Sequence, residues 1–202
     1  MSGAGALLRA RRGRQRSEVA DQAILAATLE LLTAEGYGGL TMAAVIAKSG
    51  VSSATLYRRW PTKQELVAAA LASLSSDIVD ADTGTLEGDV AALVNDVAVA
   101  LAMNEHDFAE DVAVELRRNP DLRAAVNDKF LHPRLDVFDR VVQRARARGE
   151  LGSGLSTMVG YSFVSGPLHH RVYVMGEPIT PAFRRAVVTG ALAALRALAP
   201  TR

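Results

Sequence analysis

Residues 41–63 read TMAAVIAKSGVSSATLYRRWPTK, and this stretch predicts two short helices joined by a tight turn. Thr41 carries the hydroxyl group of a helix N-cap, and Gly50 is able to end the first helix in the left-handed conformation. Ser52 is a second N-cap and opens a helix over residues 53–60. The stretch therefore predicts a helix–turn–helix arrangement.

One face of the second short helix is polar, rich in hydroxyl groups, and ends in two guanidinium groups. Its members are Ser53, Ala54, Thr55, Tyr57, Arg58 and Arg59. The opposite face carries Leu56, which we expect in the core. Hydroxyl and guanidinium groups match base edges and phosphates, so the polar face predicts contact with a nucleic acid.

Several motifs at fixed offsets surround this stretch. They are Ile24-Leu25-x-Ala27, Glu35-Gly36-Tyr37, Ile46-Ala47, Gly50-Val51-Ser52, Thr55-Leu56-Tyr57 and Lys63-x-x-Leu66. Together these motifs resemble the N-terminal domain of the TetR family of transcriptional regulators. The alternative interpretation is an ordinary corner of an all-helical protein, because short helices joined by Gly-Val-Ser also occur without a DNA-binding role.

The resemblance implies an all-α homodimer with a DNA-binding head and a larger body that holds a small ligand. It implies a ligand-responsive regulator, most often a repressor, which binds a pseudo-palindromic DNA operator and is released by an unidentified effector. The residues that it assigns to DNA are Thr41, Ser52, Ser53, Ala54, Thr55, Tyr57, Arg58, Arg59 and Lys63. Arg58 or Arg59 is expected to bind guanine edges. Phosphate contacts are expected from Thr41, Tyr57 and Lys63.

Composition narrows the remaining classes of protein. The 202 residues are 49% apolar, enough for a substantial core, and contain no cysteine, which excludes disulfides and thiolate metal sites. No apolar run approaches the length of a membrane-spanning helix, and we expect no secretory signal. The lack of cysteine is compatible with a reducing cytoplasm, where we expect the protein, and we expect no membrane partner, metal or cofactor.

Charge is distributed unevenly along the chain. Residues 1–63 hold nine Lys and Arg against four Asp and Glu, and the rest holds fourteen against eighteen, so the net charges are +5 and −4. A basic first third suits a head that binds a polyanion. Residues 1–16 lack periodicity and are expected to form a disordered basic arm. In that arm Arg14 and Arg16 either follow the DNA backbone or solubilise the chain.

Stripes of apolar residues at helical spacing suggest a division into two domains. Residues 17–63 are predicted to form the helix-turn-helix DNA-binding domain. Residues 64–202 are predicted to form the ligand-binding and dimerisation domain, whose first helix, residues 64–80, connects the two. Residues 104–107 are expected to be a polar break between helices.

Glycine and proline mark several helix boundaries. Gly36 is expected to end the first long helix. Asn119 and Thr180 each precede a proline, so each is predicted to cap a helix that begins with that proline. Pro133 and Pro167 are expected to interrupt or kink the helices in which they lie.

The last two helices are predicted to form the dimer interface. One carries a heptad-like seam from Met158 to Met175, and the other has two apolar stripes, which require two partners. The residues predicted at the interface are Met158, Tyr161, Leu168, Val172, Val187, Val188, Ala191, Leu192 and Leu195. Gly190, Ala193 and Ala197 would let two copies of the last helix approach closely. The alternative is a last helix buried wholly inside one monomer.

A ligand pocket is expected among the middle helices. Its candidate lining residues are Leu101, Met103, Phe108, Leu116, Phe138, Met158, Tyr161 and Phe163. Methionine and aromatic residues at helical spacing are also ordinary core residues, and that alternative stays open.

Two other functional classes are an enzyme and a helical small-molecule-binding protein that does not bind DNA. The chain has no Gly-rich phosphate loop, no Gly-x-Ser-x-Gly elbow and no Glu-x-x-His pair, so we expect no catalytic residues. Glu105-His106-Asp107 is either a metal-attracting cluster or a polar loop cap, and we expect the cap. The basic polar face argues against a carrier that ignores DNA.

Overall fold

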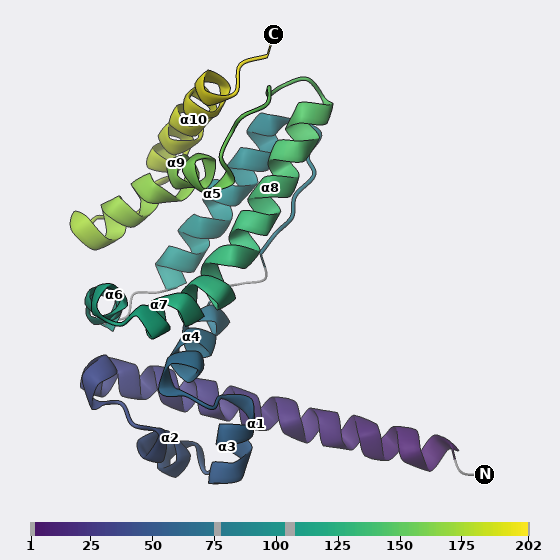
Figure 1. Ribbon diagram of the computed structural model, residues 1–202, viewed down its shortest axis with the longest axis vertical. Helices are drawn as coiled ribbons and strands as arrows, with labels where there is room; N and C mark the ends of the chain where they lie inside the picture. Colours follow the sequence, from purple (N-terminus) through teal and green to yellow (C-terminus); the bar gives the residue numbers. More distant parts are fainter. Residues whose placement is uncertain (1–2, 75–77, 104–107, 202) are drawn as a thin grey trace. The chain divides into compact units, whose positions relative to one another are not determined.

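The computed structural model of the chain describes residues 3–74, 78–103 and 108–201, and side chains within 17–74, 78–101 and 111–201 (Figure 1). Within these ranges all regular secondary structure is helical, which confirms the predicted all-α class. The predicted polar break at residues 104–107 lies outside the described residues. No helix among those described is both long enough and apolar enough to cross a membrane.

The contacts between Cα atoms divide the chain into two units. The head unit is Met1–Ser73 with Glu110–Val126, and the body unit is Leu74–Ala109 with Asn127–Arg202. The sequence analysis placed residues 110–126 in the second domain, whereas their contacts group them with the head. The reason is that α7 (Pro120–Val126) packs along α4 (Lys63–Ser73), which sequence spacing alone does not show.

The first helix, α1 (Gly3–Gly39), differs from the prediction at its start and agrees with it near its end. Residues 1–16 were expected to be a disordered arm, but the chain is helical from Gly3. Alanine, leucine, arginine and glutamine dominate this segment, and all are strong helix formers even without an amphipathic stripe. Gly36 breaks the helix as predicted, with φ +66° and ψ 177°, a conformation that favours glycine.

Two short helices follow, α2 (Met42–Ser49) and α3 (Ser53–Arg59). The predicted caps are confirmed: Gly50 adopts a left-handed conformation with φ +69°, and Thr41 and Ser52 accept hydrogen bonds at the two helix starts. The core of the head unit includes the fully buried residues Ile24, Leu32, Leu40, Val45, Leu56 and Leu66. Ile46 and Val51 are only half-buried.

The head unit also contains most of α6 (Phe108–Arg118), which leads into α7. The predicted cap of α7 is confirmed, because Oδ1 of Asn119 accepts a hydrogen bond from the Leu122 N–H at 3.0 Å. Thr62 caps α4 in the same way through the Glu65 N–H. Helices α4 and α7 thus both begin at side-chain caps that the sequence indicates.

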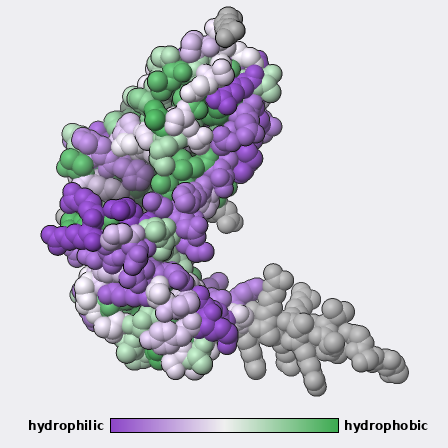
Figure 2. Space-filling model, in the orientation of Figure 1, coloured by the Kyte–Doolittle hydropathy of each residue, from purple (hydrophilic) through white to green (hydrophobic). Residues whose placement is uncertain are grey.

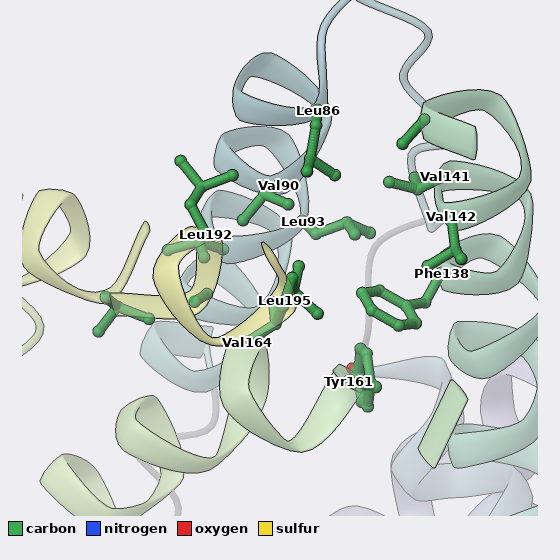
Figure 3. Packing of buried hydrophobic residues seen from close by; sticks show 14 of the residues in the cluster. Leu86, Val90, Leu93, Phe138, Val141, Val142, Tyr161, Val164, Leu192 and Leu195 are labelled. Atoms are coloured by element: carbon green, nitrogen blue, oxygen red, sulfur yellow. The ribbon is translucent and has the colours of Figure 1, made fainter. Parts of the chain in front are cut away.

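The body unit is a helical bundle. Its elements are α5 (Leu86–Met103), η1 (Asn127–Leu131), α8 (His132–Ala147), α9 (Thr157–His169), η2 (His170–Val174) and α10 (Pro181–Leu198). Side chains from α5, α8, α9 and α10 meet in one core (Figure 3). There the ring of Phe138 lies edge-on to the ring of Tyr161, with centroids 5.9 Å apart and a 64° interplanar angle.

Two π-helical turns adjoin the prolines that were predicted to interrupt helices. The turn η1 leads directly into α8, where Pro133 occupies the first turn. The turn η2 follows α9, which contains Pro167. The turn η1 contains the Lys129 carbonyl, which Pro133 leaves without its usual donor, and a π-helical turn accommodates such a carbonyl.

Hydrophilic residues line one side of the body unit along α8 (Figure 2). Asp80 accepts hydrogen bonds from Arg140 at 2.6 Å and from Arg144 at 3.0 Å, while Arg148 pairs with the buried Asp89 at 3.1 Å. These pairs tie α8 to the start of α5 and to the segment before it.

Candidate nucleic-acid interface

The polar face of α3 is exposed to solvent. Ser53, Ala54 and Arg58 are exposed, as is 48% of Tyr57, while Leu56 on the opposite face is fully buried. Arg58 makes no hydrogen bond or ion pair within the part of the chain that the structure describes. Its guanidinium donors are therefore free to bind another molecule.

Hydroxyl groups hold the N-termini of α2 and α3. Oγ1 of Thr41 accepts a hydrogen bond from the Ala44 N–H at 3.1 Å. Oγ of Ser52 accepts one from the Thr55 N–H at 3.3 Å and lies 2.9 Å from the Thr55 hydroxyl. Because Thr41 and Ser52 remain exposed, both helix starts are accessible to an anion.

Arg59 points toward α1, although the sequence analysis expected it to face bases. It forms an ion pair with Asp21, and its Nη2 donates to Oγ of Ser17 at 2.6 Å and to the Ser17 carbonyl at 3.3 Å. These bonds fix the C-terminal end of α3 against α1. On the neighbouring helix, Lys48 pairs with Glu30 at 2.7 Å and ties α2 to α1.

Lys63 is also engaged within the head unit. Its Nζ donates a hydrogen bond to the Tyr37 carbonyl and lies 4.2 Å from the centroid of the Tyr37 ring. Burial lowers the pKa of Lys63, and the nearby carboxylate of Glu115 opposes that shift. The ammonium group thus binds the C-terminal end of α1 rather than projecting into solvent.

The residues around Gly36 and Tyr37 join α1 to α6 and α7, which the sequence analysis did not anticipate. Nδ2 of Asn119 donates to the Tyr37 hydroxyl at 3.3 Å. A Cβ atom placed on Gly36 would lie 2.9 Å from Oδ2 of Asp111, and the positive φ of this residue independently favours glycine. No local pattern links these positions, because they are distant in the chain.

Two predicted DNA contacts, Arg14 and Arg16, lie in the first half of α1, and their side chains are outside the described set. The cluster Glu105-His106-Asp107 falls among the residues that are not described. Among those that are, no group of three or more His, Cys, Asp and Glu side chains is arranged to hold a metal ion.

The predicted pocket residues whose side chains are described differ in burial and in the unit to which they belong. Phe138 and Tyr161 are buried in the body core, whereas Met158 and Phe163 are exposed and Leu116 belongs to the head unit. The side chains of Met103 and Phe108 are outside the described set.

Two surface grooves were found in the body unit instead. One of about 450 Å³ lies between α5 and α10, and one of about 530 Å³ runs along α5 and η2. Leu101, a predicted pocket residue, lines the larger groove. Arg184 lines both grooves and donates a hydrogen bond to Oδ1 of Asn95 at 2.7 Å.

Most residues predicted at the dimer interface are in the core of one chain. The buried ones are Tyr161, Leu168, Val187, Ala191, Leu192 and Leu195. They pack α9 and α10 against α5 within the body unit, so they offer no surface to a second copy. Val172 and Val188 are half-buried, and Met158 is exposed.

Capped short helices with a solvent-facing, cationic second member define a helix-turn-helix DNA-binding protein. A family model described as "Bacterial regulatory proteins, tetR family" matches residues 24–70. A second, described as "Tetracyclin repressor-like, C-terminal domain", matches residues 80–191, more than half of the chain. The chain belongs to the TetR family of transcriptional regulators, which are not enzymes.

Individual relatives agree with this assignment. The chain is 34% identical over 159 residues to the uncharacterized HTH-type transcriptional regulator Rv1556 of Mycobacterium tuberculosis, covering 78% of each chain. It is 30% identical over 172 residues to the DNA-binding transcriptional repressor TetR of Mycobacteroides abscessus, covering 83% of this chain and 89% of the relative.

Solved structures share the fold. The TetR family transcription regulator SCO0332 superposes with a TM-score of 0.64 at 25% identity, over 86% of this chain and 97% of that one. FadR of Bacillus subtilis, solved in complex with stearoyl-CoA, superposes with a TM-score of 0.62 at 17% identity, over 85% and 97% of the two chains. At that lower identity the likeness concerns the fold alone.

Proposed function

We propose that the protein is a ligand-responsive repressor that binds a pseudo-palindromic DNA operator as a homodimer and leaves it when a small molecule binds the body. The observation that carries the DNA-binding part is the exposed face of α3, with Arg58 unpaired in the described part of the chain. Repression is supported by the relative from Mycobacteroides abscessus, which is named as a repressor. Because chromosomal DNA is the proposed partner, we place the protein in the cytoplasm.

Arg58 is the proposed base-reading residue, through two hydrogen bonds to one guanine in the major groove. Ser53, Ala54 and Thr55 would lie near the same groove. Phosphates would be bound by Tyr57 and by the exposed N-termini at Thr41 and Ser52, where free N–H groups favour an anion. Arg14 and Arg16 are proposed to contact the DNA backbone beyond them.

Arg59 and Lys63 are assigned a different part in DNA binding. Their charged groups already bind Asp21 and the Tyr37 carbonyl, and breaking those contacts would cost free energy. We propose that they hold α3 and α4 in the DNA-binding position. Their positive charges would attract DNA phosphates from the positions that these contacts fix.

Dimerisation is proposed through the exposed faces of α9 and α10. Met158, Val159 and Phe163 are exposed on α9, and each is at least 43% accessible. On α10 the small residues Gly190 and Ala193 are exposed, and no atom lies within 4 Å of a Cβ placed on Gly190. An apolar face without a partner beside a small-residue surface suits the same face of a second copy.

Two heads are needed because one short helix reads only a few base pairs. An effector would then act by binding the DNA-incompetent form of the dimer more tightly than the DNA-bound form. A coupling free energy of about 1–3 kcal/mol would change DNA affinity roughly 5–150-fold. FadR with stearoyl-CoA is one protein of this fold that holds a small molecule.

The connection between α7 and η1 suggests how effector binding in the body unit would affect the head unit. Helix α7 packs on α4 within the head unit, and the chain passes from Val126 of α7 directly into η1 of the body unit. Movement of α8 on effector binding would therefore pull on α7. Because α7 holds Tyr37 through Asn119, the pull would reach the end of α1.

Ala193→Arg tests the dimer. The new guanidinium group would lie at the proposed interface, so the mass by light scattering should fall from two chains to one and operator affinity should drop sharply. Ala147→Arg, at an exposed position on α8, is the matched control and should remain dimeric. A wild-type protein that is monomeric at every concentration and still binds the operator would contradict the proposal.

A further inference from the structure

An arginine of the body unit is buried without a full set of partners. Arg134, on α8, is only 5% exposed. Its Nη1 donates to the Phe130 carbonyl at 2.8 Å, and its guanidinium carbon lies 3.8 Å from the centroid of the Phe130 ring. Its Nη2 is buried and has no hydrogen-bond partner among the described residues. A buried cationic donor without an acceptor is costly, so an acceptor atom supplied by a bound molecule would stabilise this group.

Polar groups from two other helices lie around Arg134. Tyr161 on α9 and Asp96 on α5 are both buried and close enough to favour the arginine charge. Burial nevertheless lowers the pKa of Arg134 by more than these neighbours raise it. Positive charge at this position is therefore only partly compensated by the protein.

His169 is a further ionisable group near this arginine. Its Nδ1 donates to the Ser165 carbonyl at 2.8 Å, which leaves Nε2 as the acceptor of a neutral ring. Burial and the charge of Arg134 both lower the pKa of His169, so the ring is neutral near pH 7. The ring of Tyr173 lies 5.9 Å from it. A neutral imidazole and aromatic rings thus accompany a single cation.

We propose that Nη2 of Arg134 binds the carboxylate of the effector, and that the effector is an organic monocarboxylic acid with an apolar body. This inference rests on the proposed function and specifies its ligand class. One unpaired donor and one partly compensated cation match a single negative charge. A phosphate dianion would need more donors than the one that Arg134 leaves unpaired. The nearby aromatic rings that would contact the rest of the molecule are Phe130, which lies against the Arg134 guanidinium, and Tyr173, which lies beside His169.

The test compares each acid with its own methyl ester, because the two share a skeleton and differ in charge. Suitable pairs are decanoate, 1-naphthoate and indole-3-acetate with their methyl esters. Binding to the full-length protein is followed by thermal shift and then by calorimetry. At least one acid should bind the wild type roughly 10- to 100-fold more tightly than its ester, as expected for a charge-assisted hydrogen bond in a buried site.

Variants then assign the preference to Arg134. Arg134→Met should abolish the preference for the acid, and Arg134→Lys should retain part of it. Arg140→Met, at an exposed position on the same helix, is the control and should bind the acid as the wild type does. The comparison of acid and ester in the wild type remains decisive even if Arg134→Met fails to fold.

Two results would overturn the inference. In one, none of the acids binds the wild type more tightly than its ester. In the other, Arg134→Met binds the acid unchanged, which would leave Arg134 the purely structural role of holding η1 to α8. The proposed function is tested separately, by DNA release. An acid that binds through Arg134 without releasing DNA upholds the carboxylate site and contradicts ligand-responsive regulation. An uncharged compound that releases both the wild type and Arg134→Met from DNA upholds ligand-responsive regulation and contradicts the carboxylate site.

Discussion

Nδ2 of Asn119 donates a hydrogen bond to the hydroxyl of Tyr37 at 3.3 Å, across 82 positions of sequence. Asn119 also caps α7, and the Tyr37 carbonyl accepts the hydrogen bond of Lys63 at the start of α4. One tyrosine therefore joins the end of α1 to both α4 and α7. The orientation of α1 and α4 decides where α3 lies, so this contact supports the DNA-binding face.

Replacing either partner should destabilise the head to a different degree. Tyr37→Phe removes only the hydroxyl and should lower the free energy of unfolding by about 0.5–1.5 kcal/mol. Asn119→Ala removes the same bond and also the cap of α7. It should lower the free energy of unfolding by about 1 kcal/mol more than Tyr37→Phe does. Urea unfolding measures both, and the double variant should lose less than the sum of the two losses. Strict additivity would show that the two side chains do not interact.

Arg58 and Arg59 are adjacent, yet their replacement should have opposite consequences. Arg58→Ala should weaken operator binding by about 1–3 kcal/mol and relax the base preference at one position, with little change in stability. Arg59→Ala should instead lower the free energy of unfolding by about 1–3 kcal/mol, because it frees Asp21 and Ser17. Fluorescence anisotropy on operator variants and urea unfolding separate the two effects.

Lys48→Ala is the control for these arginines. It removes a positive charge from the head and a surface ion pair with Glu30, so it should change stability by less than about 1 kcal/mol. Its effect on DNA binding should be similar for all sequences. Operator affinity that is unchanged in Arg58→Ala would show that α3 does not read bases through this residue.

Gly160 is closely packed in the body core. A Cβ atom on it would lie 2.8 Å from Cε1 of Phe138 and 3.1 Å from Cδ2 of Leu195. Gly160→Ala should therefore lower the thermal stability of the protein, by about 1–3 kcal/mol in the free energy of unfolding. Gly166→Ala, where a Cβ meets no atom within 4 Å, should be neutral or stabilising. Equal effects of the two changes would contradict this packing.

Asp89 should make stability depend on pH in the acid range. Burial raises its pKa, but hydrogen bonds from the Thr83 N–H and hydroxyl and from Arg148 outweigh it, so the pKa is lowered overall. A carboxylate with a lowered pKa stabilises the folded state above its unfolded pKa of about 3.9, and the contribution is lost as pH falls through the folded value. Asp89→Asn should thus be clearly less stable than the wild type at pH 7.

Measurements at two pH values check that prediction. The difference in unfolding free energy between wild type and Asp89→Asn should shrink from pH 7 to pH 3. Asp82→Asn, an exposed carboxylate in the same segment, should differ little from the wild type at either pH. A difference for Asp89→Asn that is constant with pH would mean that its ionisation is not linked to folding.

Local chemistry made several elements predictable from sequence. The caps at Thr41, Ser52, Asn119 and Thr180 and the left-handed Gly50 depend on residues within three or four positions, and all were confirmed. Short-range rules of this kind need no knowledge of which helices meet.

The sequence did not predict which helices pack against each other, because the spacing of apolar residues does not identify the helix that covers an apolar face. The seam through Tyr161 and Leu168 packs within its own chain, although the same pattern is typical of a dimer. Arg59 and Lys63 are cations at suitable positions, but their partners lie 42 and 26 residues away. The unpaired Nη2 of Arg134 carries no sequence signal, since it is defined by burial alone.

Selection of bound duplexes from a random DNA pool by the full-length protein is the sharpest test of DNA reading by a dimer. We predict enrichment of a two-fold symmetric sequence, with binding that weakens steeply as salt increases. The same selection with Arg58→Ala should lose preference at one base pair in each half-site. Failure to enrich any sequence at low salt, or enrichment of a single asymmetric site, would contradict the account.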